Sequence, residues 1–332
     1  MERSNIPPGA VLPSETTVPL SQTLGRENVG HSDLSPLKAY PFHEFLKLEI
    51  PKREMIMAPW LPDRGLAMIY GKTGIGKSWL GLSVGVAVAY GRDFLGFIVP
   101  SARKVLVIDG EMQYAMLAER LSKILFGFGV EDASGDSLVA LADSVQDGRS
   151  LPDLSTEIGQ AQVQEFVAVA DLIILDNLST LTRSGRENEA ESWQTMQAWL
   201  VALRRAGKSV ILVHHAGKSG QQRGTSKRED VLDTIVEVRR PQDYVASQGI
   251  RFELHFQKAR QLYGVDAEPF EASCEVRNDQ ALWTRGPISN IRQDEARRLR
   301  DGGKSIREVA AEMGTSKSTV TRLLDEQEPQ LL

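Results

Sequence analysis

Cysteine is almost absent from this chain. Cys274 is the only cysteine in 332 residues. The chain can therefore form neither an internal disulfide nor a zinc site built from several thiolates. Such cysteine usage is typical of the reducing cytosol, so no redox or zinc chemistry is indicated.

Long apolar runs are also missing. No stretch reaches the ~18 uninterrupted apolar residues that a membrane-spanning helix needs, and the richest run, Trp79–Tyr90, contains Ser83. The N-terminal segment is interrupted by prolines between Pro7 and Pro19 and lacks the basic and apolar regions of a signal peptide. We therefore expect a cytoplasmic protein that does not act in a membrane.

An overall excess of positive charge is lacking as well. The chain has 39 Lys and Arg against 44 Asp and Glu, a net charge of −5. Bulk charge thus gives no reason to expect nucleic-acid binding, and only a local concentration of basic residues could supply it. The apolar (41%) and charged (25%) fractions are near globular averages, which excludes a fully disordered chain, a collagen-like fibre and a coiled-coil rod.

The length predicts a core of roughly 200 to 250 residues with appendages. Residues 1 to 38 contain five Pro, five Ser and no aromatic residue, a composition that cannot bury enough surface to offset the entropy of ordering. We expect a disordered arm over residues 1–42, a core over 43–285 and a small third unit over 286–328. No internal repeat of fixed period is present.

Short apolar runs alternate with longer amphipathic ones, which predicts an α/β fold with a mostly parallel sheet and flanking helices. Four runs lack polar alternation, as expected for strands buried on both faces: Leu66–Tyr70, Lys104–Asp109, Asp171–Asp176 and Ser209–His214. Helices are expected at Ser78–Tyr90, Tyr114–Phe126 and Glu191–Arg205. Two later runs, Val231–Val238 and Arg251–Gln257, alternate more and predict an antiparallel extension.

A phosphate-binding loop follows the first strand. The pattern G-x-x-x-x-G-K-[ST] is matched by Gly71, Lys72, Thr73, Gly74, Ile75, Gly76, Lys77 and Ser78. The glycines let backbone N–H groups point inward, and the helix that follows adds its positive end. The pattern assigns Lys77 to the β- and γ-phosphates and Ser78 to Mg²⁺, so ATP and Mg²⁺ are the expected ligands.

Acidic residues end two other buried strands, at the edge where open α/β sheets place ligands. Asp176 is our candidate for the acid on the metal side. Glu111 is our candidate for the general base that activates a water. Two alternatives are that Asp109 is the base, and that Asp109 and Glu111 both cap the next helix.

The order of these motifs resembles that of a RecA-type ATPase core, in the branch of RepA-like hexameric replicative helicases of plasmids. The resemblance covers roughly residues 57 to 275. It implies that Glu111 is the catalytic glutamate and that one of His214 and His215 senses the γ-phosphate. It also implies a cofactor site that includes Trp79, with Arg120 and Tyr263 on the two faces of the adenine.

The same resemblance implies residues that act on the ATP of a neighbouring subunit. Arg223 resembles an arginine finger, and Lys258 and Arg260 resemble paired basic residues of ring helicases. Such residues imply a homo-oligomer, most simply a hexameric ring. For Arg223, a solvated loop cation and a DNA phosphate contact are the alternatives.

Residues 216 to 228 form a basic, glycine-rich loop with no acidic residue. In a ring, such a loop would face the pore and hold a single DNA strand by its phosphates. Lys218, Gln221 and Gln222 are our candidates for this contact. A solvated surface loop is the alternative.

The segment Ile306–Asp325 predicts a helix-turn-helix, with Ala310 where the helices cross, Gly314 in the turn and Val320 on the inner face. The unit resembles the DNA-binding domain of site-specific resolvases and invertases. Ser316 would cap the second helix, whose candidate contacts to duplex DNA are Lys317, Ser318, Thr319, Thr321 and Arg322. A purely structural or protein-binding bundle is the alternative.

Charge is divided unevenly along the chain. Residues 287–324 carry eight Lys or Arg and five Asp or Glu, a net +3, so the rest of the chain carries −8. The first hypothesis is therefore an ATP-driven DNA motor, either a replicative helicase or a helicase loader of a plasmid, phage or mobile element. The second is a DNA-binding regulator or a recombination or transposition accessory factor that uses ATP to control its oligomeric state. A small-molecule P-loop kinase is a third and weaker hypothesis.

Overall fold

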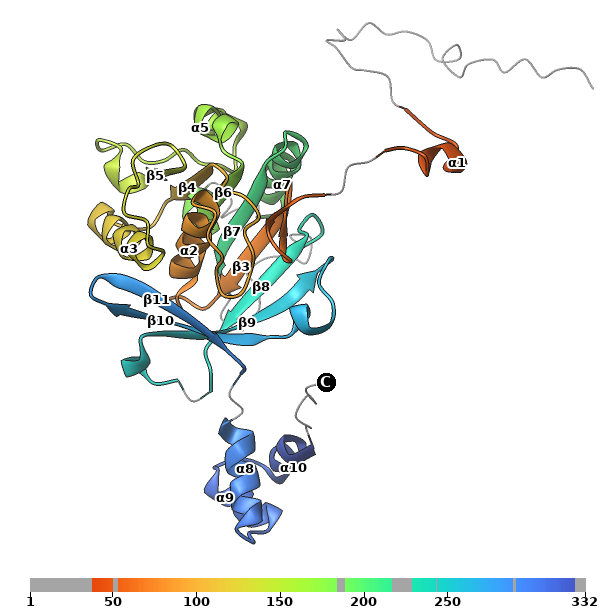
Figure 1. Cartoon of the computed structure of the whole chain (residues 1–332), viewed down its shortest axis with the longest axis vertical. Helices are drawn as coiled ribbons and strands as arrows, with labels where there is room; N and C mark the ends of the chain where they lie inside the picture. Colours follow the sequence, from red (N-terminus) through yellow and green to blue (C-terminus); the bar gives the residue numbers. More distant parts are fainter. Residues whose placement is uncertain are drawn as a thin grey trace, which may run out of the picture. The chain divides into compact units, whose positions relative to one another are not determined.

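The computed structural model describes residues 38–49, 53–183, 189–216, 229–242, 244–288 and 291–325 (Figure 1). The chain divides into two units, Met1–Pro51 and Lys52–Leu332. The described part of the first unit contains one short helix, α1 (Phe42–Phe45), and its apolar side chains are exposed.

A nine-stranded sheet forms the centre of the second unit, in the order β11-β10-β9-β8-β3-β7-β6-β4-β5 (Figure 1). Six strands are parallel: β3 (Leu66–Gly71), β4 (Val105–Asp109), β5 (Leu138–Ala142), β6 (Leu172–Asp176), β7 (Ser209–His215) and β8 (Thr234–Arg239). The four predicted parallel strands are confirmed with shifts of at most one residue, and so is the mostly parallel α/β fold. β5 was not foreseen, because its burial is only partial.

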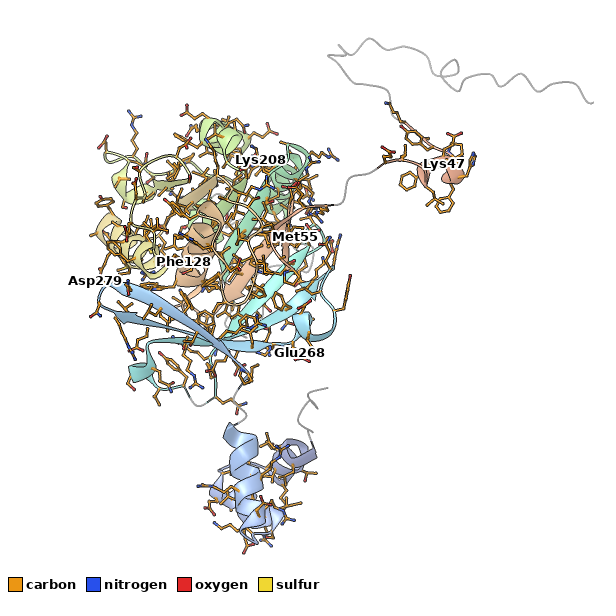
Figure 2. All side chains as sticks on the ribbon, in the orientation of Figure 1. Lys47, Met55, Phe128, Lys208, Glu268 and Asp279 are labelled. Atoms are coloured by element: carbon orange, nitrogen blue, oxygen red, sulfur yellow. The ribbon has the colours of Figure 1, made fainter. Side chains whose placement is uncertain are left out.

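Alternate residues of the parallel strands enter two separate cores. In β6, Ile174 packs on one face of the sheet, and Ile173 and Leu175 pack on the other. The first face is covered by α2 (Lys77–Ala89) and α3 (Tyr114–Gly127). The second is covered by α4 (Glu157–Gln162), α5 (Gln164–Val169), α6 (Leu178–Leu181) and α7 (Glu189–Arg205). Figure 2 shows side chains filling the space between these layers.

The antiparallel extension is formed by β9 (Ile250–Ala259), β10 (Phe270–Arg277) and β11 (Gln280–Gly286). The run Val231–Val238, expected in this extension, joins it to the parallel part, since β8 pairs in parallel with β3 and antiparallel with β9. The first five residues of β8 are mostly buried, which fits a strand inside the parallel part. β11 packs on α3, where a Cβ at Gly127 would lie 2.1 Å from the carbonyl oxygen of Ala281, so only glycine fits there.

Smaller elements complete this unit. A short hairpin of β1 (Met55–Met57) and β2 (Leu61–Pro62) precedes β3. Three 3₁₀ turns, η2, η5 and η6, span Asp143–Val145, Ala246–Gln248 and Gly264–Ala267. No helix in the described part of the chain is both long and apolar enough to cross a membrane.

Three helices follow the sheet: α8 (Ile291–Asp301), α9 (Ile306–Glu312) and α10 (Lys317–Asp325). They share a small core that includes Ala296, Val309 and Val320. Gly314 has a φ of 59° in the turn between α9 and α10, a conformation that favours glycine. The predicted three-helix unit is therefore confirmed.

Cys274 provides a test of the packing of the extension. It lies in β10 with 5% of its surface exposed, and burial raises the pKa of its thiol to about 12. Because only the thiolate reacts, we expect Cys274 in the native protein to resist a thiol-specific reagent at pH 8 and to react fully once denaturant unfolds the chain. Stoichiometric labelling of the native protein within minutes would contradict this packing.

Candidate functional site

The parallel strands end at a common edge, and this edge carries the predicted chemistry. Gly71 at the end of β3 pairs with His215 at the end of β7. Asp109 at the end of β4 pairs with Asp176 at the end of β6. Residues more than a hundred positions apart in the sequence thereby lie at the same edge of the sheet.

The phosphate loop connects β3 to α2 at this edge. Gly74 and Gly76 have φ angles of 73° and 114°, which bulky side chains rarely adopt. A Cβ at Gly71 would lie 2.4 Å from the carbonyl oxygen of Val238, so the loop can begin only with glycine. The loop leads into the first turn of a 13-residue helix, whose positive end favours an anion.

A cavity of about 450 Å³ opens beside the loop. Most predicted nucleotide residues line it, namely Thr73, Gly74, Ile75, Gly76, Lys77, Ser78, Trp79, Glu111, Arg120 and His215. Met112, Gln113, Met116, Arg240, Gly249 and Ile250, which were not predicted, line it as well. The space and the loop suit a nucleoside triphosphate.

Lys77 is buried at the start of α2. Its Nζ donates to the carbonyl oxygen of Lys72 at 3.0 Å and lies 3.2 Å from Nδ1 of His215. Burial lowers the pKa of Lys77 to about 8, although the carboxylates of Asp176 and Glu111 oppose the shift. A bound phosphate would favour its charged form.

Two buried carboxyl groups lie behind the loop, on Asp109 and Asp176. Burial raises the pKa of Asp176 to about 7; the hydroxyl of Ser78, which donates to this carboxyl group, opposes the shift, and the neighbouring Asp109 adds to it. Within the described residues, Oδ2 of Asp176 has no hydrogen-bond partner.

The hydroxyl of Ser78 and the carboxylate of Asp176 suit Mg²⁺, because this ion prefers oxygen ligands. In the described part of the chain, no group of three or more His, Cys, Asp and Glu side chains could hold a metal ion. A magnesium ion held by Ser78 and Asp176 would therefore depend on the phosphates of a nucleotide for further ligands.

Glu111 reaches the cavity, whereas Asp109 does not line it. The side chain of Glu111 is 48% exposed. Oδ1 of Asp109 instead accepts hydrogen bonds from the backbone N–H groups of Glu111 and Met112, at 3.1 and 2.7 Å. Asp109 thus holds the turn that presents Glu111. The geometry favours Glu111 over Asp109 as the base, and this role stays a prediction.

Of the two predicted histidines, only His215 faces the cavity. Its Nε2 lies 3.4 Å from Oε2 of Glu111, and its Nδ1 lies 3.3 Å from Oγ1 of Thr73. His214 is 3% exposed and, by the alternation of β7, points to the opposite face of the sheet. His215 is therefore the better candidate for a phosphate sensor.

Asn177 was missed by sequence reasoning. Its Nδ2 donates to Oε2 of Glu111 and lies 3.0 Å from Nε2 of His215. Its Oδ1 accepts from the backbone N–H of Thr180 and so caps α6. Its place directly after Asp176 was the available signal, although an asparagine there can also be explained by the cap alone.

The two sides of the cavity beyond the phosphate loop are both cationic. On one side, the guanidinium carbon of Arg120 lies 5.5 Å from the ring centroid of Trp79. On the other side, Nη2 of Arg240 donates to the carbonyl oxygen of Gly74 at 2.7 Å. The guanidinium carbon of Arg240 lies 3.9 Å from the ring centroid of Tyr244. Nothing in the sequence pattern marked Arg240, because it lies in an irregular connection between β8 and β9.

The lining of the cavity does not include Lys258, Arg260 or Tyr263. Lys258 pairs with Ile235 near the start of β8, about 13 Å along the strand from the carboxyl edge. Arg260 donates to the carbonyl oxygen of Asp230 at 3.2 Å, and Tyr263 is 79% exposed. Lys258 and Arg260 thus do not reach the cavity of their own chain, and they could act only on a nucleotide bound by a neighbouring subunit. Tyr263 does not stack over the cavity of its own chain.

The remaining predicted residues belong to the basic loop and the tail. Arg223, Lys218, Gln221 and Gln222 lie outside the described residues, as does the side chain of Arg322. In α10, Lys317, Ser318 and Thr321 are exposed and Thr319 is half-buried. Oγ of Ser316 accepts from the backbone N–H of Thr319 at 3.2 Å, which confirms the predicted cap.

Replacing Arg240 tests the side of the cavity that sequence reasoning missed. We expect Arg240→Ala to weaken the binding of both ATP and ADP about tenfold, because a cation and an anchor of the phosphate loop are both lost. Isothermal titration calorimetry measures this change. The matched control is Arg239→Ala, since Arg239 pairs with Glu237 and does not line the cavity. Equal affinities of the two variants would contradict a role for Arg240.

Two family models match separate parts of the chain. A family model described as an AAA domain, AAA_25, matches residues 32–221. A model described as the helix-turn-helix domain of resolvase matches residues 287–327. No curated protein matches the chain.

Among solved structures, the chain is similar to the flagellar accessory protein FlaH from Methanocaldococcus jannaschii. The two are 11% identical, with a TM-score of 0.46, over 67% of this chain and 90% of FlaH. The AAA model, in contrast, matches more than half of the chain. The chain therefore belongs to the AAA_25 family of AAA domains, and it joins this P-loop ATPase domain to a resolvase-type helix-turn-helix.

Proposed function

We propose that this protein is an ATP-hydrolysing DNA motor: a RepA-like oligomeric replicative helicase, or a helicase loader, of a plasmid, phage or mobile element. One observation carries the proposal. His215 lies 3.2 Å from Lys77 and 3.4 Å from Glu111, and the basic loop begins at the next residue. His215 therefore lies between the phosphate site and the candidate base, and it is followed in the sequence by the loop that is the candidate DNA contact.

Hydrolysis would use the groups at the carboxyl edge. The backbone N–H groups of the loop and Lys77 would bind the phosphates, and Ser78 and Asp176 would hold Mg²⁺. When bound, the metal would supply positive charge beside the phosphate oxygens. Glu111 would accept a proton from the attacking water. Asn177 and His215 contact its carboxylate and would fix its orientation.

An oligomer would complete the site. Lys258 and Arg260 lie away from the cavity of their own chain, a placement that suits residues acting on a neighbour's ATP. Arg223, in the basic loop, is the proposed arginine finger. A fixed guanidinium there would stabilise the charge that develops during phosphoryl transfer. A hexameric ring is the proposed arrangement, with Lys218, Gln221 and Gln222 holding a single strand in its pore.

The tail would bind duplex DNA through α10. Lys317, Ser318, Thr319, Thr321 and Arg322 are the proposed contacts. A six-fold ring and a dyad-symmetric duplex site differ in symmetry, so the six tails would not all bind one such site at once. The tail would then recruit the motor to a DNA site, and it would not itself move along the DNA.

The second candidate function is that of a DNA-binding regulator, or of a recombination or transposition accessory factor, that uses ATP to control its oligomeric state. The resolvase-type helix-turn-helix favours it, because this unit is absent from the RepA-like helicases that the core resembles. Both candidates require ATP binding and DNA binding. They differ in whether hydrolysis drives strand separation.

Glu111→Ala tests the base and the motor together. We expect turnover to fall by about 10²- to 10⁴-fold while ATP binding stays intact, since this is the contribution of proton transfer by a positioned base. Wild-type ATPase is expected to rise with single-stranded DNA, and a forked duplex is expected to be unwound. Turnover with and without DNA, strand displacement and the mass of the assembly are the measurements.

The matched control is Glu119→Ala, because Glu119 is exposed on α3, pairs with Lys123 and does not line the cavity. Normal hydrolysis by Glu111→Ala would show that another residue is the base. An ATPase indifferent to every DNA would exclude the motor. Stimulation by DNA without unwinding would favour the regulator.

Lys317→Ala combined with Thr321→Ala tests the tail. We expect duplex affinity to fall about tenfold or more, since a lost base or phosphate contact in the groove costs roughly 1 to 3 kcal/mol. ATPase stimulated by single-stranded DNA should be unchanged. Lys304→Ala is the control, because Lys304 is basic but precedes α9 and pairs with Glu312. Fluorescence anisotropy with duplex DNA gives the affinities, and equal values for variant and control would reject the tail contact.

A further inference from the structure

A cationic hollow lies at the edge of the sheet opposite the nucleotide cavity. Its volume is about 350 Å³, and it is lined by Arg53, Arg64, Arg204 and Asp233. Asp233 precedes β8, and its carboxylate accepts from the backbone N–H of Leu66 at the start of β3. Because Leu66 and Gly71 are five residues apart on one strand, the hollow and the phosphate loop are about 17 Å apart.

Asp233 accounts for only part of this cluster. Its Oδ2 accepts from the backbone N–H of Leu66 at 3.0 Å, from Arg204 at 2.9 Å and from Arg53 at 3.4 Å. These bonds satisfy a carboxylate that is 11% exposed. One negative charge cannot neutralise three arginines, so the hollow keeps an excess of positive charge even with Asp63 beside Arg64.

Asp233 does not pair with Arg64. The side chain of Arg64 is 63% exposed, and its Nε lies 3.5 Å from Oδ2 of Asp63. Its φ of 55° is a left-handed conformation that an arginine adopts only at a cost, while glycine would adopt it freely. Folding alone therefore gives no reason for an arginine at this turn.

Arg204 also has hydrogen-bonding capacity left. Its Nη2 donates to the carbonyl oxygen of Val231 and to Asp233. Its Nε is buried, and within the described residues it has no hydrogen-bond partner. The buried Nε cannot contact an anion in the hollow, but the side chain as a whole is 28% exposed, so its terminal N–H groups can.

We propose that Arg53, Arg64 and Arg204 form a second phosphate-binding site, distinct from the phosphate loop. Guanidinium groups bind phosphate oxygens through paired N–H donors, and the excess positive charge of the lining favours such an anion. The phosphate can be free or can belong to the backbone of a single DNA strand. The site does not depend on the proposed helicase activity.

The experiment uses the full chain saturated with Mg²⁺ and ADP, so that the phosphate loop is filled. Pyrophosphate is titrated in one arm and a dephosphorylated oligo-dT strand in the other. We expect Arg64→Ala to weaken binding in at least one arm about fivefold or more, a loss typical of one charged contact. The matched control is Arg277→Ala, since Arg277 is 66% exposed in β10 and pairs with Glu275.

The two arms identify the source of the phosphate. A loss confined to pyrophosphate indicates free phosphate. A loss with the DNA strand, together with a slope of log affinity against log salt that is less steep by about 0.7, indicates one lost backbone contact. Unchanged binding of both probes by Arg64→Ala would overturn the site.

Arg64→Gly separates ligand binding from a structural role. Glycine relieves the left-handed backbone, so this variant should unfold at the same temperature as the wild type or at a higher one, yet bind the phosphate as weakly as Arg64→Ala. A lower unfolding temperature, with binding unchanged, would show that Arg64 serves the fold and not a ligand. Arg204 is not substituted, because its loss would leave the buried carboxylate of Asp233 without its closest paired cation.

Discussion

The parallel pairing of β3, β4, β6 and β7 is the constraint on which the site depends. Parallel strands in register end at the same edge, so the loop after Gly71 meets the acids after β4 and β6 and the histidine after β7. A shift of one residue in any strand would turn its side chains to the other core. The two apolar faces of the sheet thus fix the position of polar groups that contribute little to stability themselves.

Burial gives this edge its electrostatic character. Lys77, Asp109 and Asp176 are all buried there, and burial shifts the pKa of each toward its neutral form. The attraction between Lys77 and Asp176 opposes that effect only in part, and the repulsion between Asp109 and Asp176 adds to it. A ligand carrying phosphate and a divalent cation would supply opposite charges to the lysine and to the two carboxyl groups, so the site suits such a ligand.

The overall charge of −5 hides this arrangement. Arginines gather at the amino edge of the sheet around Asp233, while the carboxyl edge combines acids with Lys77 and His215. The tail adds its own excess of basic residues. Because electrostatic recognition depends on local charge, partners are indicated by these separate clusters and not by the sum.

The sequence by itself determined the phosphate loop, the buried strands and the three-helix tail, because each is encoded by a local pattern of glycine or of apolar spacing. Only the tertiary structure decided that Asn177 and Arg240 reach the cavity, that His215 and not His214 faces it, and that Tyr263 lies away from it. These placements depend on the order of the strands, on which face of the sheet each residue of a strand points to, and on an irregular connection. Such properties arise from long-range pairing, which no short segment encodes.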